Sequence, residues 1–384
     1  MTQLAVAVSG GVDSLCALLR LREQGHDVLA LHGLFLPDAA SSGLRPAPEG
    51  PRLLTAAEAL AAPLPPASRQ AVEGLQTACG QLGIPLHVAD MRAVFDREVV
   101  TPFVRAYARG RTPNPCALCN RAIKFGALLD AALSLGADRI ATGHYARLLD
   151  GPAGPVLAAA DDLAKDQSYF LYMLGQNALE KAMFPVGHLT KAQVREIAEE
   201  AGLANSRKKD STGVCFIGER HFKPFLQQFL PAQPGNMRTL EGKVVGRHDG
   251  LMYYTLGQRR GLGIGGAGNG ERWFVLAKDM EHNELIVTQG ADHPLLYSKN
   301  AMGTDATWIF GEAPADEFDC TCKYRYRQPD QAVHVSVREN GQVLVTAKER
   351  QRAVTPGQSM VFYQGAVCLG GAICDTVLDA GQVG

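Results

Sequence analysis

Short apolar runs alternate with helical stretches through the first 145 residues, and this alternation constrains the fold more than any other feature of the chain. The run at 4–8 predicts a buried strand, and a helix follows from about Asp13 to Gln24, where Gly25 ends it. Strands that alternate with helices predict an α/β domain with a doubly wound parallel sheet. The further strands are expected at 28–31, 84–90 and 138–145, and the further helices at 70–82, 95–109 and 120–135.

The alternation is interrupted once and later gives way to a different pattern. Residues 36–69 hold seven prolines and many alanines, which predicts a surface loop insertion, with a functional lid as the alternative. From about residue 235, short strands are separated by glycine turns, a pattern typical of β-barrels. We therefore expect an α/β domain over 1–215, a small central domain over 216–298 and a C-terminal β-barrel over 299–384.

Bulk composition narrows the class of protein. The net charge of −1 does not by itself indicate a nucleic-acid binder, although a local basic surface is compatible with it. No apolar run reaches the roughly 18 residues of a membrane helix, and the N-terminus lacks the basic region of a signal peptide. Nine scattered cysteines favour a reducing compartment over a disulfide scaffold. These observations predict a cytoplasmic protein with no membrane partner.

A glycine turn joins the first strand to the first helix in "AVSGGVDS", residues 7–14. Adjacent glycines let backbone N–H groups close around phosphate oxygens, and the helix N-terminus adds partial positive charge. Asp13 is placed to hold Mg²⁺ or to cap the helix. The loop lacks the lysine of a Walker loop, and it resembles the pyrophosphate-binding loop of the N-type ATP pyrophosphatases. The alternative is an ordinary tight turn between a strand and a helix.

Cys116 and Cys119 form a Cys-x-x-Cys pair in "TPNPCALCN". Zinc needs four ligands, usually as two such pairs. Cys320 and Cys322 are the only comparable later pair, and they fit one face of a strand better than a metal site. A thioredoxin-like disulfide is also disfavoured, because the first pair does not open a helix of a compact βαβ unit.

Cys215 stands in "KKDSTGVCFIGER", after the basic run 207–209. Nearby positive charge lowers the pKa of a thiol, and Gly213 lets the backbone bend beside it. A buried structural cysteine is the alternative. Cys119 is far from Cys215 in the sequence, so the fold must bring them together if they act as a pair.

Eight motifs occur in order between residues 7 and 371, and together they resemble the bacterial tRNA-specific 2-thiouridylases, also called tRNA-uridine 2-sulfurtransferases. The resemblance covers nearly the whole chain. That family activates the C2 carbonyl of the wobble uridine with ATP, then installs sulfur carried as a cysteine persulfide. The motifs are "AVSGGVDS", "GRTPNPCALCNRAIKFG", "ADRIATGHYAR", "DLAKDQSYFLYML", "KKDSTGVCFIGER", "GLMYYTLGQRRGLGIG", "YRYRQ" and "AVTPGQSMVFYQGAVCLGG".

The resemblance implies a role for each matching residue. Cys119 matches the nucleophile and Cys215 the persulfide carrier. A persulfide donor, either a cysteine desulfurase or a sulfur-relay protein, is the implied protein partner, and tRNA with a wobble uridine is the substrate. The residues that would bind ATP with Mg²⁺ are Ala7, Val8, Ser9, Gly10, Gly11, Val12, Asp13, Ser14, Gly33 and Gly143. The residues that would contact tRNA are Asn114, Pro115 and Cys116 around the target base, with His144, Lys165, Asp166, Gln167, Arg325, Tyr326 and Gln358.

A basic segment supports the RNA side of this prediction. Residues 320–352 hold seven Lys or Arg against three Asp or Glu, with aromatic residues between the arginines of "KYRYR". Arginine and aromatic side chains together suit phosphate contact and base stacking. A solvated face of the barrel is the alternative.

The chain departs from the family pattern in three places. Cys116 stands where Asp is usual, so it either replaces a general acid or base or joins Cys119 and Cys215 as a [4Fe–4S] ligand, as in related thiolating enzymes. Gly33 stands where a larger residue such as Met is common, and 36–69 differs from the usual acidic segment. Two other functions stay open: a different adenylating enzyme of the superfamily, and a non-catalytic tRNA-binding protein, which the intact "SGGVDS" disfavours.

Overall fold

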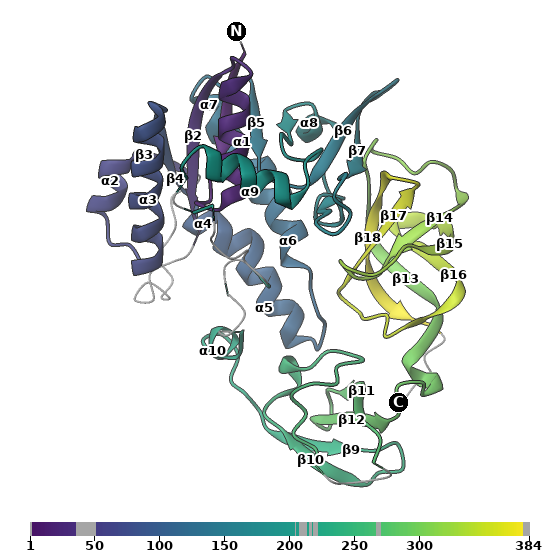
Figure 1. The fold of residues 1–384 in the computed structure, drawn as a ribbon. Helices are drawn as coiled ribbons and strands as arrows, with labels where there is room; N and C mark the ends of the chain where they lie inside the picture. Colours follow the sequence, from purple (N-terminus) through teal and green to yellow (C-terminus); the bar gives the residue numbers. More distant parts are fainter. Residues whose placement is uncertain are drawn as a thin grey trace.

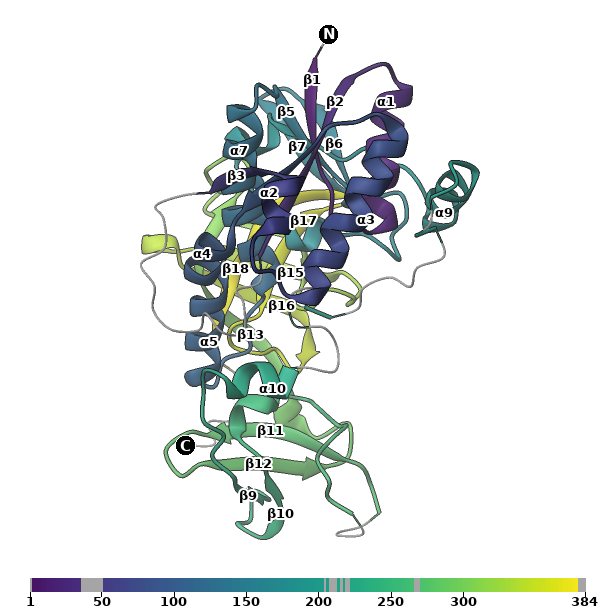
Figure 2. The same cartoon turned by 90° about the vertical axis from the view of Figure 1, so that its left-hand side faces the viewer.

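The computed structural model describes residues 2–35, 51–203, 205–206, 213–214, 217, 222–265 and 270–378. Figure 1 shows three units: a sheet with helices at the N-terminus, a small β module, and a C-terminal β-barrel. In Figure 2 the β module lies at the opposite end of the molecule from the N-terminus, below helix α5. The predicted fold class is confirmed.

The N-terminal sheet has six strands in the order β3-β4-β2-β1-β5-β8. All neighbouring pairs are parallel except β3 with β4. The strand order places β1 between β2 and β5, so their carboxyl ends meet at one edge, where ligands bind in such sheets. The bounds are β1 Gln3–Ala7, β2 Asp27–Leu34, β3 Arg52–Thr55, β4 Leu86–Asp90, β5 Arg139–Thr142 and β8 Ala182–Met183.

Helices cover both faces of this sheet. Successive side chains of a strand point to opposite faces, so Leu4 and Val6 pack under α1 while Ala5 packs toward α7. The first face is covered by α1 Val12–Glu23, α3 Pro66–Leu82 and α9 Lys191–Glu200, and the second by α7 Leu128–Ser134. The sheet is therefore doubly wound, as predicted.

The prediction of a loop over 36–69 is wrong for its second half. Residues 36–50 lie outside the described part of the chain. The rest forms β3, α2 Ala56–Ala61 and the start of α3. A capping box of Thr55 and Glu58 begins α2, and the prolines stand at the start of α3, where a missing N–H costs nothing. Leu54 and Ala59 are buried against β4 and α3, and burial of this apolar surface stabilises the segment.

One long helical stretch precedes the cysteine pair, and a second one contains it. The first runs without a break through α4 Arg92–Phe95, the π-helical turn η1 Asp96–Val100 and α5 Thr101–Ala108. The second runs through α6 Pro115–Leu118, the π-helical stretch η2 Cys119–Ala127 and α7, with a break at Gly126. A side chain at Gly126 would approach the carbonyl oxygen of Arg121 to 3.0 Å. The π-helical stretch begins at Cys119, and such stretches are frequent at functional sites.

The β module and the barrel are separate sheets. The module has the strand order β10-β9-β12-β11 around buried Met237, Val275 and Leu285. The barrel has the order β13-β16-β15-β14-β17-β18, and pairing of β13 with β18 closes it. The hairpin of β6 Ala146–Gly151 and β7 Gly154–Ala159 extends the barrel sheet through Ala158 and Val367, and so joins the N-terminal domain to the barrel.

The remaining elements are short or belong to these sheets. The module strands are β9 Gly235–Arg238, β10 Val244–His248, β11 Trp273–Asp279 and β12 Glu284–Gln289. The barrel strands are β13 Tyr297–Trp308, β14 Glu317–Lys323, β15 Gln331–Val337, β16 Val343–Arg352, β17 Ser359–Gln364 and β18 Val367–Val377. The short helices are η3 Ser168–Phe170, α8 Gln176–Leu179, α10 Phe222–Gln227, η4 Leu251–Tyr253, η5 Pro294–Leu296 and η6 Glu339–Gly341. Across the described residues, no helix has the length and apolar character to span a membrane.

Candidate active site

The turn between β1 and α1 is shaped by its own hydroxyls. Ser14 Oγ donates to the Gly11 carbonyl at 3.0 Å and accepts from Ser9 N at 3.1 Å. Gly10 has φ +75°, a backbone angle that L side chains rarely adopt, although the space around it is open. The first N–H groups of α1 have no partners within the helix, and such helix ends suit anions such as phosphate.

A second turn, after β5, packs directly on the first. A Cβ added to Gly143 would lie 2.6 Å from Ser14 N and from the backbone carbon of Asp13. Asp13 Oδ1 accepts hydrogen bonds from Tyr145 Oη at 2.9 Å and Lys191 Nζ at 2.6 Å. The helix N-cap is Gly11, with no side-chain capping bond, so the capping role expected as one alternative for Asp13 is wrong. Asp13 instead ties the turn to the second glycine turn and to α9.

His144 lies on the second turn with its side chain only 8% exposed. Lys124 Nζ donates to Nε2 at 3.1 Å, so Nδ1 carries the proton and donates to Thr142 Oγ1 at 2.7 Å. Burial, and then the Lys124 charge, hold the pKa of His144 well below its ordinary value. The imidazole is therefore neutral, and it orients Lys124 at the edge of the sheet.

Gly33 lies in β2 at the same edge of the sheet. A Cβ at this position would be 2.6 Å from the ring of Phe35. The Phe35 ring therefore occupies the space that a larger side chain would fill, and its centroid lies 5.4 Å from that of Phe95. The aromatic ring supplies apolar surface at this edge of the sheet.

The two cysteines of the pair differ in burial. Cys119 is 5% exposed and belongs to the hydrophobic cluster of Phe95 and Ile123. Cys116 is half-buried on α6, which packs against the η3 turn that carries Phe170. Burial, and then the nearby Asp166 and Cys116 groups, raise the pKa of Tyr326. Asn120 is 2% exposed, and its Nδ2 donates to the Phe170 carbonyl at 2.9 Å.

The barrel loop 355–359 docks on the segment that leads to the cysteines. Gln358 Nε2 donates to the Thr112 carbonyl at 3.0 Å, and Thr112 N donates to the Pro356 carbonyl at 3.0 Å. Asn114 Nδ2 donates to Ser359 Oγ at 3.0 Å. These bonds place the cysteine segment between the N-terminal sheet and the barrel.

Arg325 and Tyr326 follow strand β14 and lie at this same junction. Arg325 donates to the carbonyls of Leu256 and Ala353 at 3.1 and 2.9 Å. The ring of Tyr326 lies 4.4 Å from that of Phe170, and the exposed Arg327 lies 5.7 Å from the Tyr326 ring. The two half-buried rings beside Cys116 form a surface on which a flat base can stack.

The three residues of the "KDQ" motif differ in their surroundings. Asp166 is 6% exposed, and it accepts hydrogen bonds from Ala160 N, Ser168 N and Ser168 Oγ. Lys323 Nζ of the barrel lies 3.5 Å from Asp166 Oδ2. Gln167 exchanges two hydrogen bonds with the backbone of Tyr145, at 2.7 and 3.0 Å. Lys165 is half-buried. Asp166 and Gln167 thus hold the second glycine turn against the barrel.

Cys215 lies outside the described residues, as do the basic residues 207–209. Its described neighbours Val214 and Ile217 belong to the same hydrophobic cluster as Cys119. The fold thus brings the chain on both sides of Cys215 to the cluster around Cys119. Among the described residues, no three His, Cys, Asp or Glu side chains gather as a metal site.

Three site residues were missed at the level of sequence. Lys124 and Phe170 lie inside motifs that were singled out in the sequence. Their polar and aromatic character, close to predicted site residues, could have marked them as further site residues. Lys191 begins a helix far along the chain from Asp13, and no local pattern announces their contact. It is the packing of α9 on α1 that brings them together.

Three family models match consecutive parts of the chain. They are the tRNA methyl transferase HUP domain over 2–219, the tRNA methyl transferase PRC-barrel domain over 223–289 and the aminomethyltransferase β-barrel domain over 298–374.

Curated relatives match over almost the full length. The tRNA-specific 2-thiouridylase MnmA of Alkaliphilus oremlandii is 49% identical over 377 residues, 98% of each chain. Those of Exiguobacterium sibiricum and Shouchella clausii are 48% and 49% identical, over 99% and 98% of this chain and 96% and 97% of theirs.

Proposed function

Since this chain belongs to the tRNA-specific 2-thiouridylase family, we propose that it replaces the C2 oxygen of the wobble uridine of tRNA by sulfur, using ATP. One observation supports the proposal most strongly. Val214 and Ile217, which flank Cys215, lie in the cluster that buries Cys119, and the segment carrying Cys119 is held between the phosphate-binding domain and the barrel. The shared cluster supports a pairing of these two cysteines, which are far apart in sequence.

The first step uses the two glycine turns. ATP fits this edge of the sheet because the Gly10 backbone is open, and because Gly143 leaves no side chain between the turns. We assign the β- and γ-phosphates to the Ser9–Ser14 turn and the N-terminus of α1. The C2 oxygen of uridine attacks the α-phosphorus, pyrophosphate leaves, and C2 carries an adenylated oxygen. Lys124, held by neutral His144, is placed to offset the negative charge that develops.

The second step moves sulfur. A donor loads Cys215 as a persulfide, Cys–S–SH. The Cys119 thiolate attacks the inner sulfur, a Cys119–Cys215 disulfide forms, and hydrosulfide leaves. Hydrosulfide adds to C2, AMP departs with the former C2 oxygen, and 2-thiouridine remains. An external thiol then reduces the disulfide to restore both cysteines.

The target base must leave its stack to reach these groups. The ring pair of Phe170 and Tyr326 beside Cys116 offers a stacking surface for it. We assign proton transfer to Cys116, because the family usually has an acid there, and RNA contact to half-buried Lys165 and exposed Arg327. Buried His144 and Asp166 act on the RNA through the turns that they position.

Two inorganic cofactors enter the proposal. Mg²⁺ would be held by Asp13 together with the phosphates, where it would neutralise charge on the leaving pyrophosphate. The alternative [4Fe–4S] cluster would use Cys116, Cys119 and Cys215. Anaerobic purification followed by iron and sulfide analysis separates the two mechanisms: iron-free protein that still thiolates tRNA with a persulfide donor excludes the cluster.

Mass spectrometry of wobble nucleosides tests the assigned cysteines. The chain is incubated with ATP, unmodified tRNA and a persulfide source, and we expect 2-thiouridine to accumulate. Cys119→Ser and Cys215→Ser are each expected to lose at least a thousandfold in rate, because neither hydroxyl can carry or release sulfur. Cys320→Ser, on barrel strand β14, is the matched control and should keep the wild-type rate. Full activity of Cys215→Ser would instead favour a different adenylating enzyme of the superfamily.

A further inference from the structure

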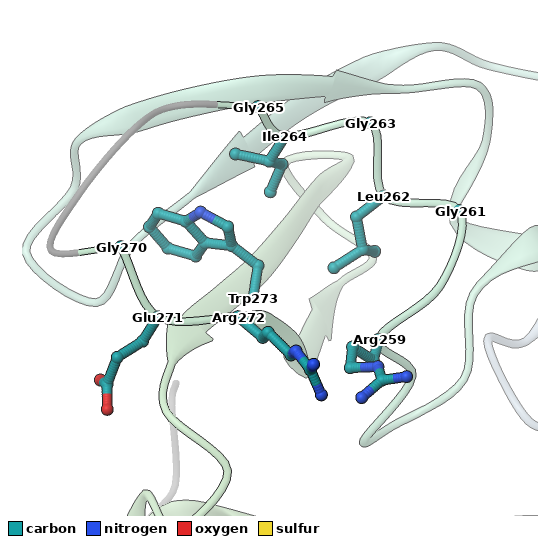
Figure 3. Close-up of a pocket in the computed structure, with 10 residues that line it drawn as sticks. All are labelled: Arg259, Gly261, Leu262, Gly263, Ile264, Gly265, Gly270, Glu271, Arg272 and Trp273. Atoms are coloured by element: carbon teal, nitrogen blue, oxygen red, sulfur yellow. The ribbon is translucent and has the colours of Figure 1, made fainter.

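The β module contains a hollow of about 810 Å³ that the thiolation chemistry does not use. Figure 3 shows residues that line it, from Arg259 to Gly265 in the glycine-rich loop after η4 and from Gly270 to Trp273 at the start of β11. The loop belongs to the motif "GLMYYTLGQRRGLGIG", to which no role has been assigned. The described lining residues are Arg259, Gly261, Leu262, Gly263, Ile264, Gly265, Gly270, Glu271, Arg272 and Trp273. We call this the arginine hollow.

The charged groups of the arginine hollow are arranged for an anion. The side chains of Arg259 and Arg272 are exposed and point toward one another in Figure 3, while Glu271 points away. Neither guanidinium has a hydrogen-bond or carboxylate partner among the described residues. Two cations that face each other repel unless an anion lies between them, and guanidinium groups match phosphate oxygens with paired hydrogen bonds.

An aromatic surface adjoins these charges. The Trp273 indole lines the hollow and points toward Ile264 in Figure 3. Arginines beside an indole face suit a nucleic-acid backbone with an unstacked base or sugar, because phosphate and aromatic contacts alternate along such a strand.

The arginine hollow is connected to the proposed reaction site. Leu256, three residues before Arg259, accepts a hydrogen bond from Arg325 at 3.1 Å. Thr255 Oγ1 lies 3.4 Å from Thr112 Oγ1, on the segment that leads to Cys116. Three extended residues span at most about 10 Å, so Arg259 lies within about that distance of Leu256. The hollow therefore begins within a few nucleotides' length of the place assigned to the target base.

From this geometry we propose that the arginine hollow binds the sugar–phosphate backbone of the substrate tRNA, close to the wobble uridine. Arg259 and Arg272 hold a phosphate between them, and Trp273 packs against the adjoining sugar or base. This proposal depends on the proposed function in one respect: both take tRNA as the molecule that the protein binds. The arginine hollow would raise the affinity for tRNA and fix the position of its backbone, because phosphate contacts position an RNA without reading its sequence.

Binding measurements with the arginine variants test the proposal. The Kd for unmodified tRNA, measured across a salt series, is expected to rise roughly tenfold in Arg259→Gln/Arg272→Gln, and the slope of log Kd against log salt should fall by about two. The double Lys variant should recover the salt slope, because it keeps both charges, but only part of the affinity, because an ammonium group cannot form the paired hydrogen bonds of a guanidinium. Arg247→Gln, an exposed arginine on β10 outside the hollow, is the matched control. An unchanged Kd and salt slope in the Gln variant, with its fold intact by circular dichroism, would overturn the proposal.

Fluorescence gives an independent readout in the folded protein. The chain has two tryptophans, and Trp308 is buried in the barrel, so Trp308→Phe leaves Trp273 as the only reporter. Titration with tRNA should quench this emission along the binding curve, and a curve with no change in emission contradicts the assignment. Both readouts are independent of thiolation: tRNA binding that depends on the two arginines without any 2-thiouridine would reject the proposed chemistry and keep the arginine hollow.

Discussion

The Asp166 carboxylate was expected to contact tRNA, and it lies buried among protein donors that come from both sides of a domain junction. Its partners are two backbone N–H groups and the Ser168 hydroxyl of the N-terminal domain, and Lys323 of the barrel, whose Nζ also lies 4.7 Å from the Tyr363 ring. A buried charge is tolerated when it is paired and hydrogen-bonded, and loss of one partner leaves the other uncompensated. We therefore expect Asp166 to stabilise the folded protein at this domain junction, in addition to any contact with RNA.

Replacement of Asp166 separates these roles. In Asp166→Asn the amide cannot accept all three hydrogen bonds, and Lys323 loses the nearer of its two carboxylates and keeps Asp330, whose Oδ1 lies 3.7 Å from Nζ. We therefore expect a loss of about 3 kcal/mol in the free energy of unfolding, measured by denaturant titration. Asp161→Asn, whose carboxylate pairs with Arg147 at a half-exposed position, should lose less than about 1 kcal/mol. Equal stability of Asp166→Asn and wild type, with weaker tRNA binding, would assign Asp166 to the RNA alone.

Between elements, the turn after β5 packs directly against the first turn of α1. Gly143 allows this contact because a Cβ would overlap the backbone of Asp13 and Ser14. Tyr145 of the same turn and Lys191 of α9 then fix this helix turn through Asp13. The phosphate turn is therefore shaped by its neighbours as much as by its own glycines.

Gly143→Ala tests this dependence. The added methyl group must push the turns apart, so we expect the KM for ATP in the thiolation assay to rise at least tenfold and the Tm to fall. Gly74→Ala is the control, because Gly74 lies inside α3 with open space around it, and alanine there should leave activity unchanged and slightly raise stability. Wild-type kinetics in Gly143→Ala would show that the contact does not shape the ATP site.

The sequence predicts an element well when residues within that element determine it, and poorly when contacts with distant segments determine it. The strands and helices around the phosphate turn follow from apolar periodicity and terminal glycines, and they match the structure. The segment 51–69 was missed because its prolines and alanines suggest a loop, while its burial depends on contacts with β4 and α3. The π-helical stretch at Cys119 and the Lys191–Asp13 pair have no local signature, since both arise from tertiary packing.

Across the whole molecule, the units meet around the cysteine segment. The β module contacts the end of α5, where Lys278 Nζ donates to the Gly110 carbonyl at 3.0 Å. The barrel contacts Thr112 and Asn114, and the hairpin β6–β7 joins the N-terminal domain to the barrel sheet. A site shared by three units requires that they keep their relative positions.

Lys278 makes one of these junctions pH-dependent. Burial lowers the pKa of Lys278 to about 8, below its ordinary value of 10.5. Between these pH values the unfolded chain holds a proton that the folded chain has released, so the free energy of unfolding rises with pH across this window. Comparison with Lys278→Met isolates the effect: the stability of wild type relative to the variant should increase from pH 8 to pH 10.5. Parallel stability curves would contradict the assignment.

Oxygen tracing tests the central claim most directly. Unmodified tRNA labelled with ¹⁸O at C2 of the wobble uridine is incubated with the chain, ATP and a persulfide source, and AMP is analysed by mass spectrometry. If the C2 oxygen attacks the α-phosphorus, each 2-thiouridine formed should be matched by one AMP that carries one ¹⁸O atom. Formation of 2-thiouridine with unlabelled AMP would contradict adenylation of the uridine, and the account of the phosphate turn as the activating site would fall with it.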